Sequence, residues 1–452
     1  MTATEGPRHG VPIAHDRERH LDVNSVAARA EPSLRRAAAR FRFALCVATA
    51  VMLTMSWPLW VAPSRLPRVP CFRRLGLEPS AAVSWVTFAL VVVLLALAAA
   101  GIRVRDALVV ASVLLVARIL PDQNRFQPWA YQFLVQAVLL ATLTAPRALA
   151  WSRIWMISMY LHAGLSKLDY SFVHGSGPMF LRAALLPFAS DPDVWPEPLK
   201  LAAVLAFPAF ELAAGLMLAF RGTRRFGLAA AVGMHAALAA LLGPWALDHS
   251  AIVVVWNLAL IVQDVILFTT RHEPGDLWSR EPFDGKLAIA GVCALVILPL
   301  GERYGLLDPW PSHALYANHV ARVEIEFIAP PAEPASTDFL LNAAPELAGF
   351  VRPNAELDAL RLDLNAWSRA ARGTPIYPGG RAALGLAEAL AARYRRRLDV
   401  RVVVEGPANR WTGARARTVA VGANAIRKLA DRFRLNTRPA HVATKPAARA
   451  AL

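Results

Sequence analysis

The chain has few cysteines and few charges. Its three cysteines, Cys46, Cys71 and Cys293, lie far apart, and two of them fall within apolar segments, so neither a disulfide framework nor a CxxC redox pair is expected. Charged residues make up only 18% of the 452 residues, whereas hydrophobic residues make up 56% and the mean hydropathy is +0.37. This balance is too apolar for a soluble globular protein, so the composition predicts a polytopic membrane protein.

Two further features are missing. No apolar core lies near enough to the N-terminus to form a cleaved signal peptide, and the polar residues 1–40 are interpreted as a disordered cytoplasmic tail. No DNA- or RNA-binding motif accompanies the net charge of +16. In a membrane protein an excess of arginine first indicates topology and anionic lipid. We therefore expect membrane lipid, and no nucleic acid, among the partners.

The long apolar runs lie within residues 41–300. They predict an all-α transmembrane bundle of about eight or nine helices, because an apolar run of ~20 residues crosses a bilayer untilted and several of these runs are shorter. The runs are at about residues 41–62, 81–102, 107–120, 130–145, 151–166, 199–220, 226–242, 251–270 and 287–300.

The distribution of basic residues predicts the topology. With the N-terminus in the cytoplasm, the basic turns around Arg103, Arg147, Arg221 and Arg271 all lie inside, as the positive-inside rule requires. The loop at residues 63–80, with four arginines, does not fit this arrangement. The sequence thus predicts a multi-pass protein of the cell membrane whose C-terminal domain is extracytoplasmic.

The composition changes again where the apolar runs end. Residues 301–435 are interpreted as a small α/β extracytoplasmic domain, because residues 320–328 alternate apolar and charged side chains as a half-buried strand does. Residues 380–396 have a helical apolar face, and residues 399–405 form a second expected strand. Residues 436–452 are rich in alanine, proline and arginine and are interpreted as a disordered tail.

Lys167 ends an apolar segment and is followed by a loop rich in glycine, serine and histidine. A lysine at a membrane edge commonly lays its stem along the apolar phase and extends its ammonium to the headgroups. Partial desolvation gives it a second use, because a desolvated amine loses its proton more easily and can act as a base. Both interpretations stay open for this residue on the local sequence alone.

Several polar side chains fall inside the apolar runs, where they are costly and tend to face a bundle interior. They are Arg118, Gln136, His162, Glu211, His235, Asn257, Gln263 and Asp264. Glu211 and His235 either shape a polar cavity that binds substrate or carries protons, or make interhelical hydrogen bonds, with an arginine or histidine as the partner of Glu211. Asp264 is expected to face headgroups. His162, Glu211 and His235 have no local ligand spacing, so no metal site is predicted.

The segment from Tyr160 to Asp169, Tyr-Leu-His-Ala-Gly-Leu-Ser-Lys-Leu-Asp, resembles the Tyr-Phe-x-Ala-Gly-x-x-Lys-Leu segment of the HTTM superfamily. This superfamily comprises membrane proteins related to vitamin K-dependent gamma-carboxylase. The resemblance covers about residues 40–300. It implies that Lys167 is the catalytic base that deprotonates a reduced, vitamin K-like quinone. The cofactor-binding residues it implies are His162, Glu211, His235 and Asn257.

Two functions are therefore predicted as alternatives. The first is a quinol-dependent integral membrane enzyme, a carboxylase-like lyase or oxidoreductase, with Lys167 at an outward-facing cavity. The second is a non-catalytic, redox-associated membrane subunit or scaffold similar to the DoxX and MauE proteins, which holds a protein partner through its C-terminal domain. A transporter is a third class, but no internal repeat supports it.

Overall fold

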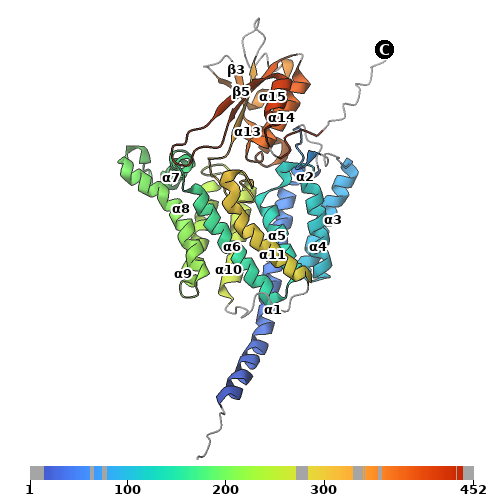
Figure 1. Cartoon of the computed structure of the whole chain (residues 1–452), viewed down its shortest axis with the longest axis vertical. Coiled ribbons are helices and arrows are strands. Elements are labelled where there is room, and N and C mark those ends of the chain that lie inside the picture. The colour runs from blue at the N-terminus through green and yellow to red at the C-terminus, as the bar shows by residue number, and fades with distance from the viewer. Residues whose placement is uncertain are drawn as a thin grey trace, which may run out of the picture.

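A computed structural model describes residues 15–61, 66–73, 79–270, 283–328, 340, 342–354, 359–395, 397–433 and 435–440, with the backbone alone at 15–30, 283 and 284. The chain forms two layers, a bundle of long helices with a small α/β domain, here called the outer domain, on one end (Figure 1). The bundle consists of α1 (His15–Met55), α3 (Ala81–Ala100), α4 (Val104–Ile119), α5 (Pro128–Thr142), α6 (Ala145–Lys167), α8 (Glu197–Ala219), α9 (Arg224–Leu242), α10 (Ala251–Thr269) and α11 (Phe283–Ile297).

Within the described residues, six helical segments are long and apolar enough to cross a membrane. They are Glu31–Met55, Ala81–Ala100, Glu197–Ala219, Arg224–Leu242, Ala251–Thr269 and Gly285–Tyr304. This confirms the prediction of a helical polytopic membrane protein. Helix α6 does not meet the same test although it has 23 residues, because polar and charged side chains interrupt it. Those side chains are mostly buried against neighbouring helices rather than exposed to lipid.

The outer domain is built on a five-stranded antiparallel sheet in the order β2-β3-β1-β4-β5. Its strands are β1 (Arg322–Ile328), β2 (Val351–Asn354), β3 (Ala359–Leu362), β4 (Asp399–Glu405) and β5 (Arg417–Val421). In the central pair Ile325 lies opposite Val402, and both are fully buried. Helices α13 (Leu364–Arg372), α14 (Gly380–Tyr394) and α15 (Gly422–Ala430) complete the domain. The strands expected at 320–328 and 399–405 are present as β1 and β4.

Both terminal segments differ from the sequence interpretation. Residues 15–40, expected to be part of a disordered tail, are the first part of helix α1, which is rich in alanine, arginine and leucine, all good helix formers. Residues 436–440 are also ordered, because the Gln123 amide donates to the Asn436 carbonyl at 2.8 Å and Arg438 pairs with Glu388 at 3.0 Å. Residues 1–14 and 441–452 lie outside the described part of the chain.

The arginine-rich loop that did not fit the topology packs under the outer domain. In its described part, Leu66 and Val69 are each 1% exposed, and Arg372 of α13 donates to the Leu66 carbonyl at 2.8 Å. Arg372 also pairs with Asp122 at 3.1 Å, beside the short turn η2 (Gln123–Arg125). The loop therefore belongs to the contact between bundle and outer domain.

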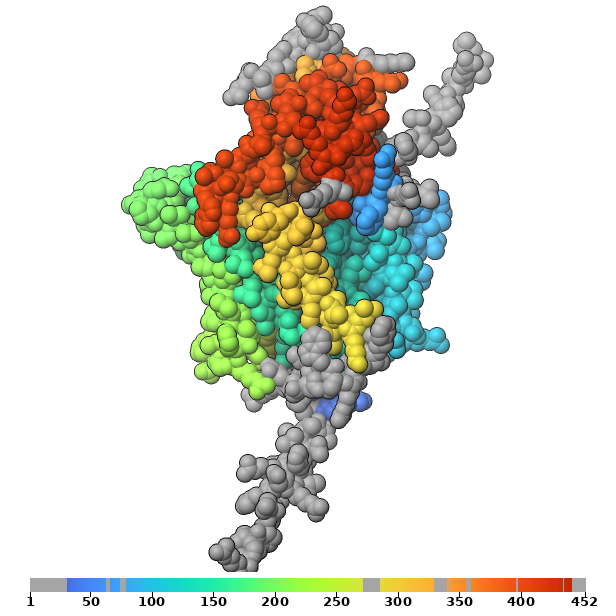
Figure 2. All heavy atoms as spheres, viewed as in Figure 1, coloured from blue at the N-terminus to red at the C-terminus, as the bar shows by residue number. Residues whose placement is uncertain are grey.

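Figure 2 shows the outer domain resting directly on the end of the bundle, with one orange-red extension reaching down towards α7 (Gly177–Leu185). This extension is the β4–β5 connection. Its Arg410 carbonyl accepts a hydrogen bond from the Tyr170 amide at 2.8 Å, and the Arg410 side chain donates to the Leu168 carbonyl at 3.1 Å. The outer domain is thus fastened at the end of α6, next to Lys167.

Candidate functional site in the α6–α10 bundle

Helices α6, α8, α9 and α10 form the part of the bundle that holds most of the predicted site residues. Two glycines let α6 and α8 approach closely. A Cβ on Gly164 would lie 2.7 Å from Leu212 Cγ, and a Cβ on Gly215 would lie 3.1 Å from the Tyr160 Cβ. Small residues at helix crossings are the usual means of bringing membrane helices together, and here they bring two charged side chains into contact.

Those side chains are Lys167 of α6 and Glu211 of α8. The lysine Nζ donates to Glu211 Oε1 at 2.9 Å, to Glu211 Oε2 at 2.7 Å and to the Ala163 carbonyl at 3.1 Å. Lys167 is 5% exposed and Glu211 is 9% exposed. An ammonium has three N–H donors, and all three are used here. Interhelical bonding of Glu211 was one of the two alternatives for this residue, but its partner is Lys167 rather than an arginine or a histidine.

His235 and Asn257 lie in a second cluster, here called the polar core, together with Tyr160 and Asp264. His235 Nδ1 lies 2.8 Å from Asn257 Oδ1, and His235 Nε2 lies 2.8 Å from the Tyr160 hydroxyl, which also contacts Asp264 Oδ2. Asp264 is fully buried. The expectation that it faces headgroups was therefore wrong, because the rotation of α10 turns this residue towards α6 and α9.

His162 is separate from both clusters. Its Nε2 lies 2.8 Å from the carbonyl oxygen of Val296 in α11, so the ring ties α6 to α11. His162, Glu211 and His235 thus make three different sets of contacts. Throughout the described ranges, no group of three or more His, Cys, Asp or Glu side chains is placed to hold a metal ion.

A third polar network joins α5 to α10. Gln132 donates to Gln263 at 2.8 Å and accepts from the indole N–H of Trp256 at 2.6 Å. Gln136 accepts from Ser152 of α6 at 2.5 Å. Polar side chains that are costly in the membrane are thus bonded to one another across helices.

A cluster of four charged side chains, here called the outer joint, lies where the bundle meets the outer domain. His319, in the connection leading to β1, places Nδ1 2.9 Å from Asp169 and Nε2 2.8 Å from Glu302, and Arg303 also donates to Asp169. Burial alone would lower the pKa of His319, but its bonds to the two carboxylates outweigh burial and raise this pKa above its ordinary value. Burial would raise the pKa of Asp169, yet the bonds from His319, the Phe172 amide and Arg303 bring it below its ordinary value.

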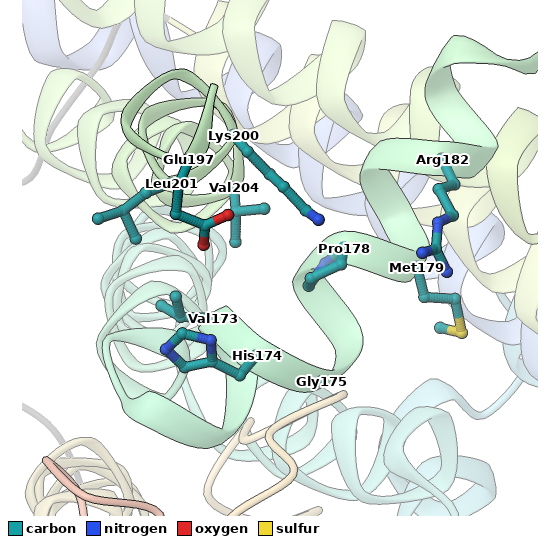
Figure 3. A pocket seen from close by; sticks show the side chains of 10 residues that line it. All are labelled: Val173, His174, Gly175, Pro178, Met179, Arg182, Glu197, Lys200, Leu201 and Val204. Carbon is teal, nitrogen blue, oxygen red and sulfur yellow. The ribbon is translucent and has the colours of Figure 1, made fainter. Parts of the chain in front are cut away.

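A cavity of about 310 Å³ lies elsewhere, between the start of α8 and the segment that includes α7 (Figure 3). His174, Arg182, Glu197 and Lys200 line it with apolar neighbours. None of the predicted site residues is among its lining residues. The assignment of Lys167 as catalytic and of His162, Glu211, His235 and Asn257 as cofactor-binding stays a prediction.

Comparison with known proteins identifies one similarity. Residues 145–252 match the family model described as methylamine utilisation protein MauE. The match covers 108 of the 452 residues and includes helices α6, α8 and α9, with the first two residues of α10. No curated protein and no solved structure matches the chain.

This match overturns two sequence expectations. The resemblance to the HTTM superfamily was wrong, because the segment that carried it lies within the MauE match. The carboxylase-like function of the first alternative falls with it, and the second alternative, a MauE-like membrane subunit, has the support. A reduced quinone as cofactor was implied only by the overturned resemblance. The match and the apolar helices together indicate a multi-pass membrane protein.

Proposed function

We propose that the chain is a non-catalytic membrane accessory protein of the MauE type, and that it serves methylamine utilisation. The observation that carries the proposal is the MauE match, which falls on α6, α8 and α9. The chemistry of that region supports a scaffold. The Lys167 Nζ is bonded to three protein acceptors, two on Glu211 of α8 and one on the Ala163 carbonyl, so this side chain joins α6 to α8.

The partner is a protein held by the outer domain. This domain is bonded directly to the bundle through Arg410 and through the Arg372–Asp122 pair, so a partner bound to the outer domain is held at the end of the helices. Strand β5 is the last strand of the sheet, and its Val419 and Val421 are 52% and 47% exposed. An edge strand with exposed apolar side chains is suited to pairing with another chain.

Growth of the source organism on methylamine tests the proposal. Deletion of the gene should abolish growth, and the full chain should restore it. A Lys167→Met/Glu211→Leu variant should also restore growth, because it removes both members of the ion pair and leaves no unpaired charge. A Val419→Lys/Val421→Lys variant that inserts normally should fail, because it places charges on the proposed docking edge. Growth lost only in the Lys167→Met/Glu211→Leu strain would assign chemistry to the lysine and overturn the scaffold.

For the topology we propose nine spans, with the N-terminus in the cytoplasm and the outer domain outside. The N-terminal end of α1 and the outer domain lie at opposite ends of the bundle (Figure 1), and α4, α5 and α6 pack among the apolar helices. In a cysteine-free background, a membrane-impermeant maleimide should label Trp411→Cys on intact cells and spare Gly222→Cys. Trp411 is 77% exposed in the outer domain, and Gly222 lies in the basic turn between α8 and α9 with free space around it. The reverse pattern would invert the topology.

A further inference from the structure

The polar core contains an unbroken row of side chains that runs from α10 through α9 and α6 and back to α10. Asn257 contacts His235, His235 contacts Tyr160, and Tyr160 contacts Asp264. Tyr160 is 2% exposed, His235 and Asn257 are 4% exposed, and Asp264 is 0% exposed. Because this row is sealed from solvent, its hydrogen atoms can be placed by counting donors and acceptors.

Asn257 determines which ring nitrogen of His235 carries hydrogen. The Asn257 amide nitrogen donates to the Val253 carbonyl at 2.8 Å. Reversing the amide would set its oxygen against that carbonyl, which is also an acceptor. The amide oxygen therefore faces His235 Nδ1, so Nδ1 must carry the hydrogen.

Tyr160 then forces an additional proton onto the row. Its hydroxyl has one hydrogen but two partners, His235 Nε2 and Asp264 Oδ2. If Tyr160 donates to His235, Asp264 must be a carboxylic acid that donates to Tyr160. If Tyr160 donates to Asp264, His235 must be an imidazolium that donates to Tyr160. Both arrangements hold one proton more than a carboxylate, a phenol and a neutral imidazole together.

Burial decides between the two arrangements. The ionic form would place a full negative charge on Asp264, whose Oδ1 has no hydrogen-bond partner among the described residues, and an unsatisfied buried carboxylate oxygen is costly. Three other ionisable side chains of α6 and α8 are engaged elsewhere, and a fourth, Arg153 of α6, donates to the Leu267 carbonyl of α10 at 2.7 Å. Lys167 and Glu211 are bonded to each other, and His162 faces α11. The neutral form keeps every hydrogen bond of the row without separating charge.

We propose that Tyr160, His235, Asn257 and Asp264 form a proton-binding site within the membrane, in which Asp264 is held as the neutral acid. The site also provides a balanced transfer. Asp264 passes its proton to the Tyr160 oxygen while Tyr160 passes its own to His235 Nε2, which converts the neutral row into an aspartate–imidazolium pair with no proton gained or lost. The proposal stands independently of the accessory function above.

Infrared and nitrogen-15 spectroscopy on the full chain in an ester-free detergent test the site. The native protein should show the carbonyl stretch of a protonated carboxyl group, shifted in heavy water. This band should be lost in Asp264→Asn, whose amide can make the same donation to Tyr160. It should persist in the control Glu211→Gln, because both Glu211 oxygens accept hydrogen bonds from the Lys167 ammonium and the residue lies outside the row.

The histidine spectra provide a readout that needs no folded variant of Asp264. His235, assigned by the loss of its signal in His235→Gln, should be neutral with hydrogen on Nδ1. Asn257→Leu should shift part of this population to the Nε2–H form. A native spectrum with imidazolium at His235 and no protonated carboxyl would overturn the neutral acid. Neutral His235 beside an ionised Asp264 would overturn the site altogether.

Discussion

The polar core and the outer joint both bury ionisable side chains, but they satisfy them in opposite ways. At the outer joint, Asp169 and Glu302 face Arg303 and His319, so two carboxylates meet a guanidinium and a histidine whose pKa is raised. In the polar core the only cationic candidate is His235, and neutral hydrogen bonds join the residues. The Arg303 side chain at the joint keeps 22% of its surface exposed, whereas the core is sealed by helices.

This contrast shows what membrane depth allows. Full charges are retained where water can solvate part of a side chain, and deeper in the bundle they either pair completely or are replaced by neutral bonds. The Lys167–Glu211 pair lies between the two regions. Its two side chains are buried and are bonded to each other, as the charged groups of the outer joint are. The following changes break or sharpen the comparison.

The largest effect is expected from Glu211→Leu, which leaves the Lys167 ammonium buried without its carboxylate. Removing one member of a buried ion pair costs about 3–5 kcal/mol, because the remaining charge is uncompensated. Thermal unfolding in detergent should show a markedly lower Tm for Glu211→Leu. The Lys167→Met/Glu211→Leu variant should regain most of the lost Tm. Equal stability of Glu211→Leu and the native chain would show that the ammonium finds water there.

A smaller loss of stability to unfolding is expected from Gly164→Ala. The new Cβ would lie 2.7 Å from Leu212 Cγ and 3.0 Å from the Pro208 carbonyl oxygen, and overpacking a tight contact costs about 1–3 kcal/mol. Gly233→Ala in α9 is the matched control, since a Cβ there meets nothing within 4 Å. If both substitutions leave unfolding unchanged, close packing of α6 against α8 does not hold the ion pair together.

The smallest effect is a pH dependence at the outer joint. The pKa of His319 is raised above its ordinary value of 6.5 in the folded state. Its stabilising contribution is therefore fully present below the unfolded pKa and is lost as pH rises through the folded pKa. The protection of the backbone amides at residues 305–321 against hydrogen exchange, relative to the intrinsic exchange rate at each pH, should decrease over that rise.

His319→Gln is the control for this pH dependence, and it should flatten the profile of protection factors between mildly acidic and mildly alkaline pH. Asp169 acts in the opposite direction, because its lowered pKa gives a contribution that is lost as pH falls through the folded value. The outer joint is therefore expected to be most stable at pH values between the folded-state pKa of Asp169 and that of His319. A slope in the protection factors that survives in His319→Gln would assign the pH dependence to another group.

The sequence shows where the polar site residues lie along the chain, but it does not show which of them contact one another. Lys167 and Glu211 stand out as charges in apolar segments, yet the alternative in which Glu211 bonds across helices named an arginine or a histidine as its partner. Asn257 and Asp264 are seven residues apart, which places them on one face of a helix. That spacing was the available signal that Asp264 belongs with Asn257. Tyr160 carried no such signal, because an aromatic residue in an apolar helix is usual.

The sequence by itself determined the membrane class, the run of helices and the positions of strands β1 and β4, because each follows from hydropathy or from its period along the chain. Only the tertiary structure decided that Lys167 meets Glu211, that Asp264 turns inward and that the arginine-rich loop lies beneath the outer domain. These contacts join segments far apart in the chain. They depend on how each helix is rotated and on how closely Gly164 and Gly215 let two helices approach, and a period within a single segment does not specify that.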